Sequence, residues 1–357
     1  MNSMRRANWC FLLAVVSYIG GSLLLGRIAR HVELPYFLSI MSGQILIALS
    51  LVISALIFKG KAFGVIRRER LGIVDILLII CIMFLCLPLV YFINAISMLF
   101  TENAMAGTMV EMMDMPYLLN LFMVAVSPAV VEELLCRGVL HHNYRTKNVL
   151  FGVILNSVIF GLLHLNINQM LYAMALGIIF SLVVEATGSI YSSMIMHFIM
   201  NSISVTLVEL MKIIANVEIY AEELATTAVA AEGAATTTDM AAATEAAEAM
   251  VMEIPAGLSV ILYVIGFLIA FASTTCAIAL IFKLAKRRGH YEEFKAIFRI
   301  KKKAAVVDSG EDEKENVEGV VDKDVAEKRN FMYYVKDYAA LVVAAGICIT
   351  FMVLIML

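Results

Sequence analysis

Residues 116–140 read PYLLNLFMVAVSPAVVEELLCRGVL, a long apolar run that is interrupted by Glu132, Glu133 and Arg137. A helix of about 20 apolar residues is long enough to cross the hydrocarbon core of a bilayer. A charged side chain at that depth costs about 2.5–3.5 kcal/mol even on lenient insertion scales. Three such charges in one span therefore indicate catalytic chemistry or a polar cavity inside a membrane protein.

The composition of the whole chain supports a membrane protein. Of its 357 residues, 62% are hydrophobic and 16% are charged, whereas soluble domains average about 45–50% and about 25%. Because the apolar residues lie in long blocks, we predict an all-α, polytopic transmembrane helical bundle of eight or nine spans. The nine candidate spans are residues 9–26, 36–58, 72–93, 117–140, 149–165, 170–186, 189–213, 257–283 and 338–357.

The distribution of positive charge predicts an orientation. If the spans alternate from a cytoplasmic N-terminus, most of the 27 Lys and Arg residues fall in cytoplasmic segments. Cytoplasmic loops of membrane proteins carry such an excess. We therefore expect a multi-pass protein of the plasma membrane with its N-terminus in the cytoplasm.

The spans divide the chain into six parts. We expect spans one to three in residues 1–115 and a polar-decorated catalytic core, spans four to seven, in residues 116–213. Two inserted segments surround the eighth span. The remaining parts are an acidic, Ala/Thr-rich outer loop (214–256), span eight (257–283), a basic and then acidic cytoplasmic loop (284–336) and span nine (337–357).

The charged residues of the fourth span suggest a local arrangement. Glu133 and Arg137 are spaced i, i+4 with the acid first, which favours an ion pair within the helix. Glu132 points about 100° away from Glu133 and needs another environment. Pro128 cannot donate a hydrogen bond to the carbonyl of Val124, so a kink is expected there. Alternatively, all three charges are structural and pair with neighbouring helices.

Polar residues on two further spans complete a candidate site. The sequence FGLLH ends at His164, and HFIMN places His197 and Asn201 on one helical face. Glu132 could serve as general base on a water that His164 orients, or Glu132 and His164 could bind a metal. His197 and Asn201 could donate to a developing oxyanion. Each histidine alone also fits a structural role at a span end or between helices.

The three motifs EExxxR, FxxxH and HxxxN, in this order on separate spans, resemble the CAAX protease and bacteriocin-processing family. The resemblance covers residues 132–201 and implies an intramembrane endopeptidase. It implies that Glu132 activates the water with His164, that His197 and Asn201 form the oxyanion side, and that Glu133 and Arg137 support them. It also allows a divalent metal such as zinc on Glu132, His164 and His197, although this ligand set is borderline for zinc.

The expected substrate is a membrane-associated peptide or protein, such as a leader, a bacteriocin-type precursor or a lipidated C-terminus. We expect contact with membrane lipid, no nucleic-acid partner, and a cavity that opens toward the inner leaflet. One alternative is a non-catalytic immunity or scaffold protein of the same fold. Another is a transporter or ion pathway, because buried Glu, His and Arg also build proton relays.

Helix geometry raises one conflict. If spans four and five begin at Tyr117 and Val149, a rise of 1.5 Å per residue puts Glu132 and His164 about 14 Å apart in depth. For the two residues to meet, the fourth and fifth helices should extend beyond the membrane as a hairpin near residues 141–147.

Overall fold

The computed structural model describes residues 2–63, 66–101, 112–232, 256–299 and 323–356. Within these ranges the chain is nearly all helical and forms no strand, only an isolated bridge between Arg68 and Ser189. Eight of the described helices are long and apolar enough to cross a membrane. The predicted all-α, polytopic bundle is therefore confirmed, and the chain is a multi-pass membrane protein.

The fourth span, Tyr117–Tyr144, is one helical rod that alternates between α and π geometry. The elements of the rod are α5 (Tyr117–Asn120), η1 (Leu121–Val126), α6 (Ser127–Glu133), η2 (Leu134–His141) and α7 (His142–Tyr144). The other helices are α1 (Ser3–Ala29), α2 (Tyr36–Ile57), α3 (Ile73–Ser97), α8 (Val149–Leu162), α9 (Ile167–Thr187), α10 (Ile190–Glu232), α12 (Ala256–Arg288), α13 (Tyr291–Ile297) and α14 (Lys323–Met356).

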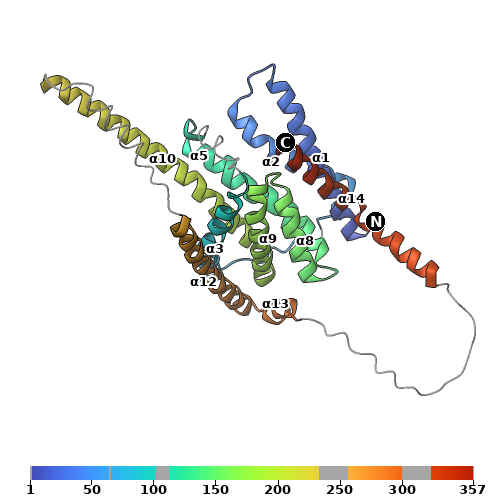
Figure 1. Cartoon of the computed structure of the whole chain (residues 1–357). Coiled ribbons are helices and arrows are strands. Elements are labelled where there is room, and N and C mark those ends of the chain that lie inside the picture. Colours follow the sequence, from blue (N-terminus) through green and yellow to red (C-terminus); the bar gives the residue numbers. More distant parts are fainter. Residues whose placement is uncertain (1, 64–65, 102–111, 233–255, 300–322, 357) are drawn as a thin grey trace, which may run out of the picture.

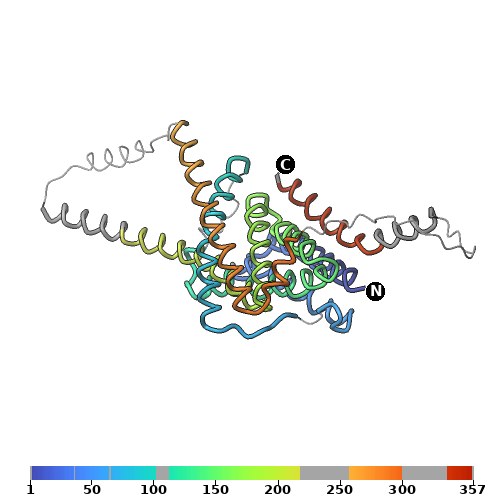
Figure 2. Tube along the Cα trace, turned by 90° about the horizontal axis from the view of Figure 1, so that it is seen from below, coloured from blue at the N-terminus to red at the C-terminus, as the bar shows by residue number. Residues whose placement is uncertain are grey.

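Helix α9 lies at the centre of the bundle. It packs against α3, α8, α10 and α12, and Figure 1 shows α3, α9 and α8 side by side. Gly177 on α9 permits a close approach to α8, because a Cβ there would lie 2.9 Å from the Cα of Ser157. Helix α14 packs against α1 on the outside of the bundle (Figure 2).

The outer helices expose large apolar side chains. Leu24, Leu56, Ile73, Phe271 and Val342 are all exposed, although each lies on a span-length helix. Such a surface would be an aggregation hazard in water, whereas lipid tails cover it without cost. The pattern thus follows from a bilayer as the solvent.

Several boundaries differ from the sequence-based expectation. Helix α8 has 14 residues, about 21 Å, so it is shorter than a ~30 Å hydrocarbon core. Helix α10 continues to Glu232 and covers the first part of the expected outer loop, consistent with the helix propensity of Ala, Leu and Glu. Helix α13 and the start of α14 lie within the expected cytoplasmic loop. Residues 233–255 and 300–322 of these two loops lie outside the described residues.

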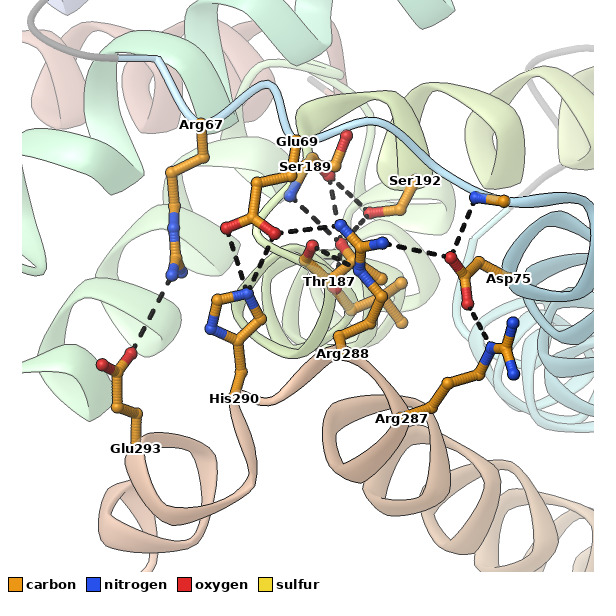
Figure 3. A network of polar contacts seen from close by, with 12 residues as sticks. Arg67, Glu69, Asp75, Thr187, Ser189, Ser192, Arg287, Arg288, His290 and Glu293 are labelled. Carbon is orange, nitrogen blue, oxygen red and sulfur yellow. Dashed lines mark hydrogen bonds and ion pairs between the residues drawn. The ribbon is translucent and has the colours of Figure 1, made fainter.

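Ion pairs tie together one end of the bundle, which we call the basic end because it carries Arg67, Arg145, Arg287 and Arg288. Asp75 at the start of α3 pairs with Arg287 (2.8 Å) and Arg288 (3.2 Å) at the end of α12 (Figure 3). Glu185 near the end of α9 pairs with Arg67 (3.0 Å) and Arg145 (2.7 Å). These contacts hold together the start of α3 and the ends of α9, α12 and the fourth span.

Candidate active site

The ion pair between Glu133 and Arg137 is present in the core of the bundle. Arg137 Nη1 lies 2.8 Å from Glu133 Oε1, and neither side chain is exposed. Arg137 also donates to the carbonyl of Gly177 on α9 (3.2 Å) and stacks over the ring of Phe160 at 4.4 Å. Pairing and stacking offset the cost of burying these two charges.

Glu133 also orients His197 on α10. The Nδ1 atom of His197 lies 3.0 Å from Glu133 Oε1. An ionised carboxylate only accepts hydrogen bonds, so this nitrogen carries a proton. The opposite ring nitrogen, Nε2, lies 4.0 Å from Oε2 of Glu132. Glu133 therefore aims the second nitrogen of His197 toward the neighbouring glutamate.

Glu132 is held by a residue from outside the motifs. Its Oε1 accepts a hydrogen bond of 2.8 Å from Nε2 of Gln44 on α2. Its Oε2 is buried and accepts no hydrogen bond from the described protein groups. One carboxylate oxygen is thus fixed, and the other remains available as an acceptor.

His164 lies in the turn between α8 and α9. Its Nδ1 donates to the carbonyl of Phe160 (2.9 Å), and its ring packs edge-on against the Phe160 ring. In the neutral ring this leaves Nε2 as a hydrogen-bond acceptor. The next residue, Leu165, has a φ of 51°, a conformation that is uncommon for non-glycine residues. Asn166 then caps α9 by accepting from the backbone N–H of Gln169.

Asn201 interacts with the carbonyl that Pro128 leaves free. In a regular helix the N–H of residue 128 would bond to the carbonyl of Val124, but proline has no N–H. The Nδ2 atom of Asn201 donates to this carbonyl at 2.9 Å. The π-helical segment η1 ends just before Pro128. Asn201 therefore links α10 to the irregular part of the fourth span, in addition to any contact with a substrate.

A cavity of about 460 Å³ brings the candidate residues together. Glu132, His164, His197 and Asn201 all line it, whereas Glu133 and Arg137 lie behind its wall. The depth conflict disappears because the fourth span continues to Tyr144, and α8 starts beside that end. Counted from that end, Glu132 lies 12 residues back along the fourth span, about 18 Å. His164, in the turn after α8, lies 15 residues beyond the start of that helix, about 22 Å.

The candidate metal ligands do not form a metal site. Glu132, His164 and His197 share the cavity, but among the described residues no group of three or more His, Cys, Asp or Glu side chains could hold a metal ion. A tetrahedral zinc site needs at least three such ligands around one point. The side chains present therefore do not fit a zinc ion, and no step below involves one.

Two polar residues of the cavity wall, Gln44 and Tyr18, were not predicted from the sequence. Both lie on the first two spans, far from the motifs along the chain. Gln44 stands in an otherwise apolar helix, and a polar residue in a span is itself a hint of function. A polar residue in a span does not reveal which neighbouring span it faces. The hydrogen bond between Gln44 and Glu132 could therefore be identified only in the structure.

Comparison with known proteins identifies a family over the part of the chain that contains the motifs. Residues 114–203 match a family model described as type II CAAX prenyl endopeptidase Rce1-like. The match covers all six motif residues discussed above, but it ends within the first half of α10. No curated protein and no solved structure matched the chain.

Proposed function

Residues 114–203 belong to the CAAX protease family, and from this premise we propose that the chain is an intramembrane endopeptidase whose general base is Glu132. One observation carries the proposal. Glu132 is fixed through one oxygen by Gln44, and it shares a cavity with both motif histidines. A positioned carboxylate next to two imidazoles is suited to activating a water for attack on a peptide bond.

In the proposed reaction a water between Glu132 and His164 supplies the attacking oxygen. Glu132 removes one proton from this water, while the free Nε2 of His164 accepts its other O–H and orients it. The hydroxide attacks the carbonyl carbon of the scissile bond. When the C–N bond breaks, Glu132 passes the proton to the amine nitrogen. The hydroxyl stays on the acyl carbon, which completes a balanced hydrolysis.

His197 is the proposed oxyanion donor. Because its Nδ1 proton is committed to Glu133, Nε2 can donate only when the ring carries both protons. In that state Arg137 and His197 balance the charges of Glu132 and Glu133, which lowers the cost of burying two carboxylates. Asn201 supplies a second donor through the amide hydrogen that Val124 does not use.

The proposed substrates are membrane-associated peptides or proteins, including lipidated ones. The cavity is embedded among span-length helices, so a substrate reaches it from the bilayer or its surface. A polar cavity also lets water reach a bond that would otherwise lie in hydrocarbon. We propose the plasma membrane as the location, with lipid as the surrounding partner and without a nucleic-acid partner.

The test is proteolysis in proteoliposomes with a mixed library of lipidated and unlipidated peptides. Wild-type protein is compared with Glu132→Gln, and Glu209→Gln serves as the matched control because Glu209 pairs with Lys212 outside the cavity. The proposal predicts cleavage by wild type and the control, abolished in Glu132→Gln and unaffected by a chelator. Equal cleavage by all three proteins would contradict it, and no cleavage would favour a non-catalytic immunity or scaffold role.

A further inference from the structure

The cavity occupies one half of the bundle. Its deep end contains Glu132, His197 and the buried ring of Phe180. From there its lining continues to the start of α2, the last turns of α3 and the first turn of α9. The lining residues Tyr91 on α3 and Met211 on α10 are exposed (49% and 57%), so the cavity reaches the surface there. We call this surface opening the mouth.

The mouth lies at the end of the bundle opposite the basic end. Asn168 in the first turn of α9 donates a hydrogen bond to Ser97 at the end of α3. The start of α9 and the end of α3 therefore lie at the same end of the bundle, next to the mouth. The other ends of these two helices carry Glu185 and Asp75, the acids of the basic-end network. Figure 3 shows the part of this network around Asp75, Arg287 and Arg288.

Ion pairs connect the side chains of the basic end, which leave only a small pocket of about 10 Å³ beside Arg67, His141 and Arg145. Glu185 is bound by Arg67, Arg145 and His141 (2.8 Å), and Arg288 joins Glu69 (2.9 Å) to Asp75. None of these side chains lines the cavity. A substrate that entered from this end would have to break several ion pairs, most of them partly buried, whereas the mouth presents no such barrier among the described residues.

Positive charge assigns the two ends to the two sides of the membrane. Among the described Lys and Arg residues near helix ends, the end with the mouth carries Arg27, Arg30 and Lys212. The basic end and its adjoining turns carry Arg5, Arg6, Lys59, Lys61, Arg67, Arg68, Arg70, Arg145, Lys147, Lys283, Lys286, Arg287, Arg288, Lys295, Arg299 and Lys336. The side of a membrane protein with the excess of Lys and Arg is the cytoplasmic side.

We propose that the cavity opens on the non-cytoplasmic side of the membrane and takes its peptide from that side. That the ligand is a peptide rests on the proposed function. The direction of the opening rests on the charge distribution and the cavity alone. It replaces the expectation of an opening toward the inner leaflet. The substrate class is then a secreted or outer-leaflet peptide, and the cytoplasmic tail of a lipidated protein is excluded.

The test is labelling of single cysteines with a membrane-impermeant maleimide in intact cells that express the full-length chain. The six natural cysteines are first replaced, although none of them lines the cavity. Asn94→Cys and Gln169→Cys report on the mouth, and two positions are used in case one variant does not fold. Lys61→Cys, exposed at the basic end, is the control for the cytoplasmic side.

The proposal predicts that the mouth cysteines are labelled in intact cells, whereas Lys61→Cys is labelled only after permeabilisation. The reverse pattern would overturn it. Repeating the labelling in a Glu132→Gln background separates this inference from the proposed function, because accessibility does not need catalysis. A labelled mouth in an inactive wild-type protein would refute the peptidase and leave the outward opening in place.

Discussion

Gln44 Nε2 donates a hydrogen bond of 2.8 Å to Glu132 Oε1, which ties the second span to the fourth at the candidate active site. The two residues are 88 positions apart in the chain. A hydrogen bond to a fixed donor holds a carboxylate in one rotamer and leaves its other oxygen available for a proton. Gln44 is therefore a positioning residue.

Replacing Gln44 should reduce turnover without removing it. A hydrogen bond to a charged group is worth about 1.5–3 kcal/mol, so Gln44→Leu should lower kcat about 10- to 100-fold. The measurement is kcat and KM on one cleaved peptide. Ser42→Ala is the control on the same helix, since its hydroxyl bonds only to the carbonyl of Ser39. A change in KM alone would show that Gln44 binds substrate instead.

The bond from Asn201 to Val124 should matter only while residue 128 is proline. Asn201→Ala should cost about 1–3 kcal/mol of stability, because a partly buried carbonyl loses its donor. Pro128→Ala restores a backbone N–H that can bond to Val124. In a double-mutant cycle, Asn201→Ala should therefore cost less in the Pro128→Ala background. Equal costs in both backgrounds, measured by denaturant unfolding, would contradict this assignment.

The buried pair of Glu133 and Arg137 should show the asymmetry of buried ion pairs. Arg137→Met alone leaves Glu133 without its cation and should destabilise the protein by about 3–5 kcal/mol. The double variant Glu133→Gln with Arg137→Met should be more stable than the single one. Thermal unfolding in detergent measures both. A double variant less stable than Arg137→Met would contradict this expectation.

The chemistry of the cavity wall predicts the character of the cleaved segment. Apart from Glu132 and the two motif histidines, which the proposed reaction uses, the lining consists of amides such as Asn94, Asn168 and Gln169, hydroxyls and apolar side chains, with no Lys, Arg or Asp. A charged substrate side chain would be desolvated there without a counter-ion. Sequencing the products of the peptide library should thus show uncharged residues on both sides of the cut. Acidic or basic residues at these positions would contradict the account.

The sequence predicted those features that depend on local periodicity. The pair of Glu133 and Arg137 follows from i, i+4 spacing, and the free carbonyl of Val124 follows from Pro128. The donors for Val124 and Glu132 come from α10 and α2, and single-span patterns contain no information about facing helices. The first two spans could be identified by their hydropathy but not placed around the site.

Two lengths also escaped prediction for physical reasons. The apolar run of span five continues past Leu162, but α8 ends there and the chain turns back through His164 and Leu165. Hydropathy does not detect such a turn inside an apolar run. Helix α10 extends to Glu232 through Ala- and Glu-rich sequence. In this segment the helix propensity of Ala and Glu outweighs the lack of an apolar face.

The central claim is that Glu132 is the base of a peptidase, and the most direct measurement is the ratio of initial cleavage rates of wild type and Glu132→Gln. Both proteins are purified and reconstituted at equal folded concentration, with one peptide taken from the library. General-base catalysis contributes about 10²–10⁴-fold, so the account predicts a loss of at least about 100-fold, with Glu209→Gln at the wild-type rate. A Glu132→Gln rate within twofold of wild type would contradict it.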